Sequence, residues 1–259
     1  MSDQSLSDRS SYRDCCDRII SDDDEFAKFK TSKQIIDIIE TISYENGLKF
    51  LNHIVNNNMN KMSSKTLDCF ATLDAFGHPY RYNYGVYGIT SPTNLRYLSV
   101  MGDIERIHGG LEDKVVVEIG SGWGGQSIML KTFYNIKKYI IIDLPEVIEL
   151  NKKCIAYSNL NLSEYEFYSS YDVLSEDIVI DSDYVISNYA FSECYRSVQE
   201  KYIQNIINKT KQFYMTCNFF TEKDMLTLSE IQSSITIPNS CIEEAPVTSM
   251  GNLLLYSNI

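Results

Sequence analysis

An acidic residue followed by closely spaced glycines is the feature of this sequence best suited to hold a ligand. Glu118 ends an apolar run, and Gly120, Gly122 and Gly124 follow it. Glycines at a turn from strand to helix let a ligand approach the backbone where a side chain would collide with it. The pattern therefore predicts a site for a nucleotide-like cofactor over residues 118–124.

The charge of Glu118 indicates which cofactor the turn holds. Spacing alone does not exclude NAD, because Gly125 stands where the third glycine of the dinucleotide motif falls. A carboxylate here would repel the pyrophosphate of NAD, but it would accept hydrogen bonds from the ammonium group of S-adenosylmethionine. A second apolar strand ends in Asp143, whose carboxylate is placed to accept the two ribose hydroxyls of either cofactor.

Other polar residues follow the remaining predicted strands, where ligands of open α/β sheets bind. Tyr171 and Asp172 follow the third strand, near the expected adenine ring, and Tyr171 either stacks on that ring or belongs to the core. The complete set of expected cofactor contacts is Glu118, Gly120, Ser121, Gly122, Trp123, Gly124, Asp143, Leu144, Tyr171, Asp172 and Ser187.

Four segments together resemble a known family. EIGSGWGGQS, IIIDLPEV, YVISNYAFSE and FYMTCN are similar to the sugar O-methyltransferases, a branch of the class I S-adenosylmethionine-dependent methyltransferases. The resemblance covers residues 70–259 and departs from the family at Trp123, where tyrosine is expected. It implies S-adenosylmethionine as the cofactor and a sugar as the acceptor, either free, nucleotide-linked or glycan-bound. The alternatives are a phenol or amine acceptor, or a binding subunit without turnover.

A sugar hydroxyl is a weak acid, so methyl transfer to it benefits from a base. Glu193 lies just past the fourth strand and is the best-placed carboxylate, unless it only caps the following helix. His78 is the other candidate, unless it is only a turn residue before Pro79. Asn188 is expected to position the acceptor. No convincing spacing of carboxylates predicts a metal ion.

Residues 74–97 are rich in aromatic rings, glycine and proline, and immediately precede the predicted cofactor domain. Rings that stack on a sugar and polar groups that bind its hydroxyls suit an acceptor loop, and the alternative is a tyrosine-rich packing segment. The expected acceptor contacts are Tyr80, Arg81, Tyr82, Tyr84, Tyr189 and Asn218.

The composition of the chain limits which substrates and which cellular compartment we expect. The 259 residues carry a formal net charge of −12 without a long Lys/Arg cluster, which argues against nucleic acid as a substrate. A nucleotide-sugar would need a local basic site such as Arg81, Arg96 or Arg106. The seven cysteines form no C-x-x-C pair, and no segment has the length and apolarity of a membrane span or a secretion signal. We therefore expect a cytoplasmic protein with reduced thiols.

The order of strand and helix patterns predicts the fold. Strands are expected at 115–119, 138–144, 165–169, 183–187, 211–217, 240–245 and 252–257, with helices at 125–134, 145–157, 197–209 and 222–234 between them. This alternation predicts an α/β fold with a doubly wound, mostly parallel seven-stranded sheet.

The chain divides into three expected parts. Residues 1–70 form an N-terminal helical extension with a disordered start of about ten residues, residues 71–110 the aromatic loop and a linking helix at 92–109, and residues 111–259 the catalytic domain. Helices are expected around 35–39 and at 43–56, with a polar loop at 57–65 and an acidic cap at 22–25. The extension either caps the site or forms a homodimer.

Overall fold

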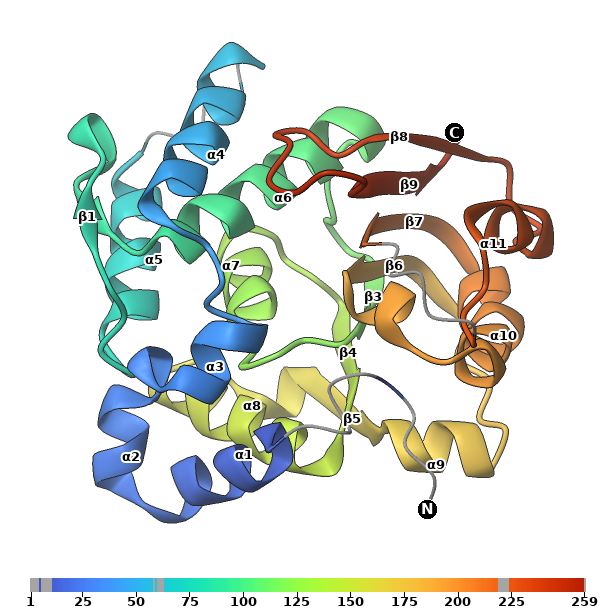
Figure 1. Cartoon of the computed structure of the whole chain (residues 1–259), viewed down its shortest axis with the longest axis horizontal. Helices are drawn as coiled ribbons and strands as arrows, with labels where there is room; N and C mark the ends of the chain where they lie inside the picture. The colour runs from blue at the N-terminus through green and yellow to red at the C-terminus, as the bar shows by residue number, and fades with distance from the viewer. Residues whose placement is uncertain (1–4, 6–10, 58, 60–62, 219–223, 259) are drawn as a thin grey trace.

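The computed structural model describes residues 5, 11–57, 59, 63–218 and 224–258, and its centre is a seven-stranded sheet (Figure 1). The strand order is β5-β4-β3-β6-β7-β9-β8, and β9 pairs antiparallel with β7. The strands are β3 (Val115–Ile119), β4 (Lys138–Asp143), β5 (Tyr165–Ser169), β6 (Ser182–Asn188), β7 (Thr210–Cys217), β8 (Asn239–Glu243) and β9 (Leu253–Ser257). The predicted doubly wound fold is confirmed.

The central strand β3 has a continuous apolar run and pairs in parallel with both of its neighbours. Val116, Val117 and Ile119 are buried, and register pairs Val117 with Ile140 on one side and Val185 on the other. A strand enclosed on both sheet faces needs such a run, because neither face meets water. The carboxyl ends of β3, β4 and β6 therefore lie at one edge of the sheet.

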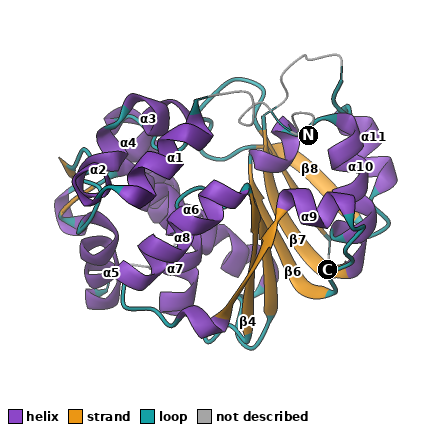
Figure 2. Cartoon of the chain, turned by 90° about the horizontal axis from the view of Figure 1, so that it is seen from below, coloured by secondary structure: helices purple, strands orange, loops and turns teal. Residues whose placement is uncertain are grey.

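Helices cover both faces of the sheet (Figure 2). One face carries α6 (Pro92–His108), α7 (Gly125–Phe133) and α8 (Pro145–Tyr157), and the other carries α9 (Ser170–Ser175), α10 (Arg196–Asn205) and α11 (Leu228–Ser234). α6 and α8 begin at a proline, whose missing N–H costs nothing at that position, and α6 ends at Gly109 with φ of 76°. The predicted bounds of α6, α7 and α8 agree with the structure within one residue.

The N-terminal helices pack on the same face as α6 to α8 (Figures 1 and 2). They are α1 (Tyr12–Ser21), α2 (Asp23–Lys28), α3 (Lys33–Ile38), α4 (Tyr44–Asn56) and α5 (Ser64–Asp74). Their buried side chains share one apolar core with the sheet, which runs from Tyr12 through Phe29 and Ile54 to Val116 and Leu254. The helical extension is therefore integral to the structure.

Several local expectations differ from the structure. Asp22 caps α2 as expected, accepting hydrogen bonds from the amides of Asp24 and Glu25. α5 begins at Ser64, within the expected polar loop, because the Ser63 hydroxyl caps it. α11 begins at Leu228, later than expected, because Thr227 and Glu230 form a capping box. The disordered start lies outside the described residues, apart from Ser5.

The aromatic segment folds away from the sheet. It contains the short strands β1 (Tyr82–Asn83) and β2 (Ile89–Thr90), which pair antiparallel and lie beside α4 and α5 at the far side of the molecule (Figure 1). No helix in the described part of the chain is both long and apolar enough to cross a membrane.

Candidate functional site

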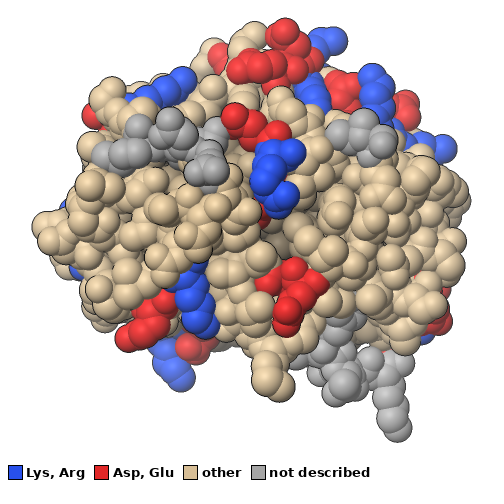
Figure 3. Space-filling model, turned by 90° about the horizontal axis from the view of Figure 1, so that it is seen from above, with Lys and Arg blue, Asp and Glu red and all other residues tan. Residues whose placement is uncertain are grey.

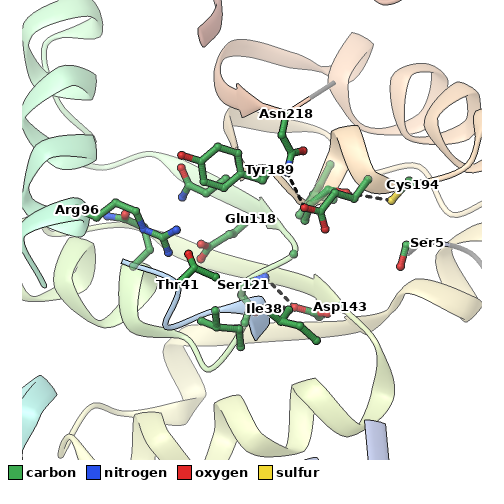
Figure 4. Close-up of a pocket in the computed structure, with 18 of the residues that line it drawn as sticks. Ser5, Ile38, Thr41, Arg96, Glu118, Ser121, Asp143, Tyr189, Cys194 and Asn218 are labelled. Atoms are coloured by element: carbon green, nitrogen blue, oxygen red, sulfur yellow. Dashed lines mark hydrogen bonds between the residues drawn. The ribbon is translucent and has the colours of Figure 1, made fainter. Parts of the chain in front are cut away.

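A cavity of about 700 Å³ opens beyond the carboxyl ends of β3, β4, β6 and β7. Figure 3 shows a hollow near the middle of one face, with acidic and basic side chains in small groups around it. Figure 4 shows the interior, with Glu118 near its centre and Arg96, Ser121, Asp143, Tyr189 and Asn218 around it. The topology thus gathers side chains from distant parts of the sequence at one edge of the sheet.

Glu118 supplies a buried carboxyl group at the centre of the cavity. Its side chain is 1% exposed and accepts a hydrogen bond of 2.8 Å from the Tyr139 hydroxyl. Burial raises the pKa of Glu118 to about 8, although the Tyr139 hydrogen bond and the Arg96 charge oppose the shift. A carboxyl group held at this cost is ready to ionise when a cation binds beside it.

Asp143 organises the turn between β3 and α7. One of its carboxylate oxygens accepts hydrogen bonds from the amides of Ser121 and Gly122, at 2.7 and 3.2 Å, and the other accepts one of 2.8 Å from the Leu144 amide. Burial nevertheless raises its pKa to about 6, against these hydrogen bonds. Asp143 therefore fixes the shape of the glycine turn while its side chain still borders the cavity.

Two glycines of the turn are required by close packing as well as by backbone conformation. Gly120 has φ of 74°, and a Cβ there would lie 2.0 Å from the Cβ of Ala190. Gly122 has φ of 57°, and a Cβ would lie 3.1 Å from the side chain of Ile39. The turn is therefore held between the segment after β6 and the N-terminal helices, with its backbone facing the cavity.

The opposite side of the cavity carries amide and carboxylate groups that follow β6 and β7. Asn218 donates a 2.8 Å hydrogen bond from its Nδ2 to Oε1 of Glu193, and its Oδ1 accepts one of 2.7 Å from the Ser192 hydroxyl. Asn188 and Tyr189 border the same space. This arrangement fixes a carboxylate and two amides where a second ligand would meet the first.

Tyr189 has φ of 70°, a left-handed conformation that is strained for a tyrosine. Its hydroxyl donates a short hydrogen bond to Glu244, which is buried and also accepts hydrogen bonds from Thr248 and Asn252. Glu244 thereby holds Tyr189 and the β8–β9 loop together. Residues of that loop, Thr248, Ser249, Met250 and Asn252, complete this wall of the cavity.

The N-terminal helices form the wall over the glycine turn. Tyr12 of α1 and the segment between α3 and α4 border the cavity, and Ile39 contacts Gly122. Glu40 anchors the segment, accepting hydrogen bonds of 2.7 Å from the Trp123 indole and 2.6 Å from the Thr93 hydroxyl. The cavity residues that sequence reasoning missed here are Ser5, Tyr12, Asp37, Ile38, Ile39, Thr41, Ile42 and Asn46.

Half of the predicted site residues border the cavity. They are Glu118, Gly120, Ser121, Gly122, Asp143, Leu144, Asn188, Tyr189, Glu193 and Asn218. Trp123 and Gly124 do not, since the Trp123 ring packs among aromatic side chains and Gly124 caps α7. Ser187 is buried, donating to the Ile119 carbonyl and accepting from the Phe191 amide.

Tyr171 and Asp172 also lie outside the cavity, because the chain after β5 enters α9 at once. The Tyr171 ring is in the core, with the Arg13 guanidinium 5.4 Å from its centre, and its hydroxyl accepts a 2.8 Å hydrogen bond from Arg13. Asp172 is exposed on α9. Tyr171 therefore belongs to the core, which is the alternative to stacking on the adenine ring.

The predicted acceptor residues of the aromatic segment are also remote from the cavity. His78, Tyr80, Arg81 and Tyr82 are exposed, and His78 has φ of 49° in a turn before Pro79. Tyr84 is buried against Tyr44. The structure therefore separates these five residues from Glu193, Asn188 and Asn218, although Arg96 and Tyr97 at the end of the same segment border the cavity.

No group of three or more His, Cys, Asp or Glu residues in the described part of the chain is arranged to hold a metal ion. The residues present do fit S-adenosylmethionine. A buried carboxyl group faces the cavity for an ammonium group, Asp143 borders it at the end of β4, and Arg96 presents a buried, unpartnered Nε.

Sequence comparison identifies a family for the catalytic part of the chain. A family model described as lysine methyltransferase matches residues 90–234. No curated protein sequence matches the chain.

Solved structures resemble the chain at low sequence identity. The PH0226 protein of Pyrococcus horikoshii OT3 is 10% identical, with 65% of this chain and 92% of that chain covered and a TM-score of 0.50. One chain from the complex of the Haloferax volcanii Trm112 methyltransferase activator is 16% identical (63% and 93% covered, TM-score 0.43). PigF with SAH is 13% identical (56% and 50% covered, TM-score 0.43).

Proposed function

The chain belongs to the lysine methyltransferase family and is an S-adenosylmethionine-dependent methyltransferase of class I fold; we propose that its acceptor is a sugar hydroxyl. The match to the family model covers β3 to β7 and the turns that follow them, including Glu193 and Asn218.

The observation that carries this proposal is the neutral, hydrogen-bonding lining of the acceptor side. The residues that border the cavity include four asparagines, Asn46, Asn188, Asn218 and Asn252, and the hydroxyl residues Thr41, Thr248 and Ser249. An asparagine amide both donates and accepts, as a sugar hydroxyl does. A molecule with several hydroxyls can form further hydrogen bonds with these groups, whereas an apolar stem cannot.

The proposed chemistry assigns distinct tasks to the residues of the two halves. S-adenosylmethionine, when bound, supplies the methyl group and the leaving group. Glu193 accepts the proton of the attacking hydroxyl as the new oxygen–carbon bond forms, and the Asn218 amide orients its carboxylate. Asn188 and Tyr189 hold the acceptor so that its oxygen faces the methyl group.

A lysine amine is the second candidate acceptor, and the family match favours it. Asp37 and Glu193 border the cavity and would attract a cationic side chain. The net charge of −12 would favour a basic peptide as well. In this case Glu193 would orient the amine and accept its proton.

Transfer of label from methyl-tritiated S-adenosylmethionine distinguishes these acceptors. The panel contains free sugars, nucleotide-sugars, lysine-rich peptides and small phenols and amines, and mass spectrometry locates the added methyl group. We expect a methyl ether on a sugar, formed by the wild type and lost in Glu193→Gln. Label on lysine peptides, with none on sugars, would contradict the proposed acceptor. Cofactor binding without turnover of any acceptor would favour a binding subunit.

A further inference from the structure

Arg96 brings a positive charge into the cavity from α6. Its guanidinium lies 5.2 Å from the ring centre of Tyr97 and 6.0 Å from that of Tyr189. Its Nε is buried and has no hydrogen-bond partner. Figure 4 shows the side chain extending into the cavity toward Glu118, beside Tyr189 and Thr41. Two rings therefore hold the guanidinium and leave polar groups to be satisfied.

The charges around Arg96 are unbalanced in a way that indicates a ligand. Among the described residues that border the cavity, Arg96 is the one lysine or arginine, and the carboxylates are Asp37, Glu118, Asp143 and Glu193. Glu118 faces the same space, yet Arg96 and Glu118 lie beyond the 4.0 Å limit of an ion pair. The guanidinium has a hydrogen bond with Tyr97, but its buried Nε has no partner and no carboxylate of the described residues pairs with it. A buried donor and charge left without a carboxylate are costly, so an anionic group is the partner that would offset this cost.

The opposed charges of Arg96 and Glu118 match the two charges of an amino acid. We propose that Arg96 binds the α-carboxylate of the methionine moiety of S-adenosylmethionine while Glu118 binds its α-ammonium group. Arginine suits this role because its planar guanidinium can donate two parallel hydrogen bonds to a carboxylate. This assignment depends on the cofactor and is independent of the acceptor.

The alternative is that Arg96 binds an anionic group of the acceptor, such as the phosphate of a nucleotide-sugar. Arg96 lies next to Asn188 and Tyr189 in the fold, so both assignments place an anion at the same guanidinium. They differ in which ligand loses affinity when the charge is removed. Cofactor fragments therefore separate them without any acceptor.

Calorimetric titration of the full chain with three ligands provides the test. S-adenosylhomocysteine carries both charged groups, its decarboxylated analogue lacks the carboxylate, and 5′-methylthioadenosine lacks the whole amino-acid moiety. Each ligand is titrated into the wild type, Arg96→Met and Lys211→Met. The last variant removes one positive charge from a surface side chain that is 79% exposed, and serves as the control for net charge.

We expect Arg96→Met to weaken S-adenosylhomocysteine binding by about 10- to 100-fold, as charge-assisted hydrogen bonds are lost. The affinities for the decarboxylated analogue and for methylthioadenosine should change less than about 3-fold. Arg96→Met should therefore bind S-adenosylhomocysteine and its decarboxylated analogue with similar affinity. Unchanged S-adenosylhomocysteine affinity in Arg96→Met would overturn the assignment. An equal loss for all three ligands would also overturn it, because it would show a purely structural role.

Discussion

Two segments outside the central sheet differ in how well their sequence predicts their role. The hairpin of β1 and β2 is rich in tyrosine, yet its described side chains lie away from the cavity. The segment between α3 and α4 has no distinctive motif, yet Ile39, Thr41 and Ile42 border the cavity. Suitable composition therefore does not place a residue at a site, because packing between distant elements decides its location.

The two candidate bases differ in the same way, since Glu193 borders the cavity and His78 does not, and the largest expected effect is the loss of Glu193. Glu193→Gln should lower kcat by about 10²- to 10⁴-fold, because it removes a carboxylate at the cavity. His78→Gln should leave kcat unchanged, because His78 is exposed in a remote turn. Steady-state kinetics on the best acceptor would compare the variants, with S-adenosylhomocysteine binding as the control for folding. Loss of activity in His78→Gln alone would reverse the assignment.

Glu118→Gln should raise the stability of the chain at high pH but weaken its binding of the cofactor. The pKa of Glu118 is about 8 in the folded chain against an ordinary value of 4.5, so the folded state retains this proton as pH rises through that range. The free energy of unfolding of the wild type therefore falls as the pH rises from 4.5 to 8, because the unfolded chain loses the Glu118 proton first. Without cofactor, the variant should be more stable than the wild type at pH 8 by roughly 3 to 5 kcal/mol.

At pH 5 the difference in unfolding free energy should fall to about 1 kcal/mol, because this pH is only half a unit above the ordinary pKa of 4.5. The same variant should bind S-adenosylhomocysteine at least about 10-fold more weakly at pH 8, having lost the charge that faces the ammonium group. Urea unfolding at the two pH values and calorimetry measure both quantities. A stability difference that does not depend on pH would show that Glu118 is ionised throughout.

Removal of a polar side chain from the N-terminal wall of the cavity should raise the KM of the acceptor modestly. Asn46→Ala removes an amide that borders the cavity and should raise the KM of the acceptor by about 2- to 10-fold, the usual value of one neutral hydrogen bond. Tyr80→Ala on the hairpin is the matched control, since this side chain is 60% exposed and remote. Initial-rate kinetics should place the control at the wild-type KM. A larger increase in Tyr80→Ala would restore the hairpin as the acceptor loop.

The smallest expected effect is that of Tyr82→Ala. Tyr82 packs against Tyr44 with ring centres 5.2 Å apart, a contact worth about 0.5 to 1.5 kcal/mol. The variant should lower the free energy of unfolding by that amount and leave kcat and KM unchanged. Chemical denaturation together with kinetics would separate the two. A change in KM without a change in stability would indicate that the hairpin contacts the acceptor.

The sheet and the cofactor turn could be predicted because their signals are local. β3 and β5 have the predicted bounds, and Glu118, Gly120 and Asp143 reach the cavity because the ends of parallel strands meet at one edge. The walls could not be predicted in the same way. Tyr12, the segment between α3 and α4 and the β8–β9 loop meet through contacts between residues far apart in sequence, and no periodic pattern encodes such a contact. Arg96 could be named as a candidate basic residue, but its place in the cavity could not be predicted.

The residues of the glycine turn have a structural role in addition to the ligand-binding role that the sequence predicts. Gly120 and Gly122 were interpreted as making room for a ligand, and the structure adds close contacts with Ala190 and Ile39. Asp143 was expected to accept ribose hydroxyls, and it also accepts amide hydrogen bonds from the turn. Cofactor binding and the fold of this turn therefore depend on the same residues.

The central claim is that the cavity over this turn binds S-adenosylmethionine, and titration with S-adenosylhomocysteine beside NAD tests it most directly. The wild type should bind the first ligand and not the second. Asp143→Asn should weaken that binding by at least about 10-fold, because it removes the charge at the end of β4. Binding of NAD, or of neither ligand, would contradict the account, as would S-adenosylhomocysteine binding that is unchanged in Asp143→Asn.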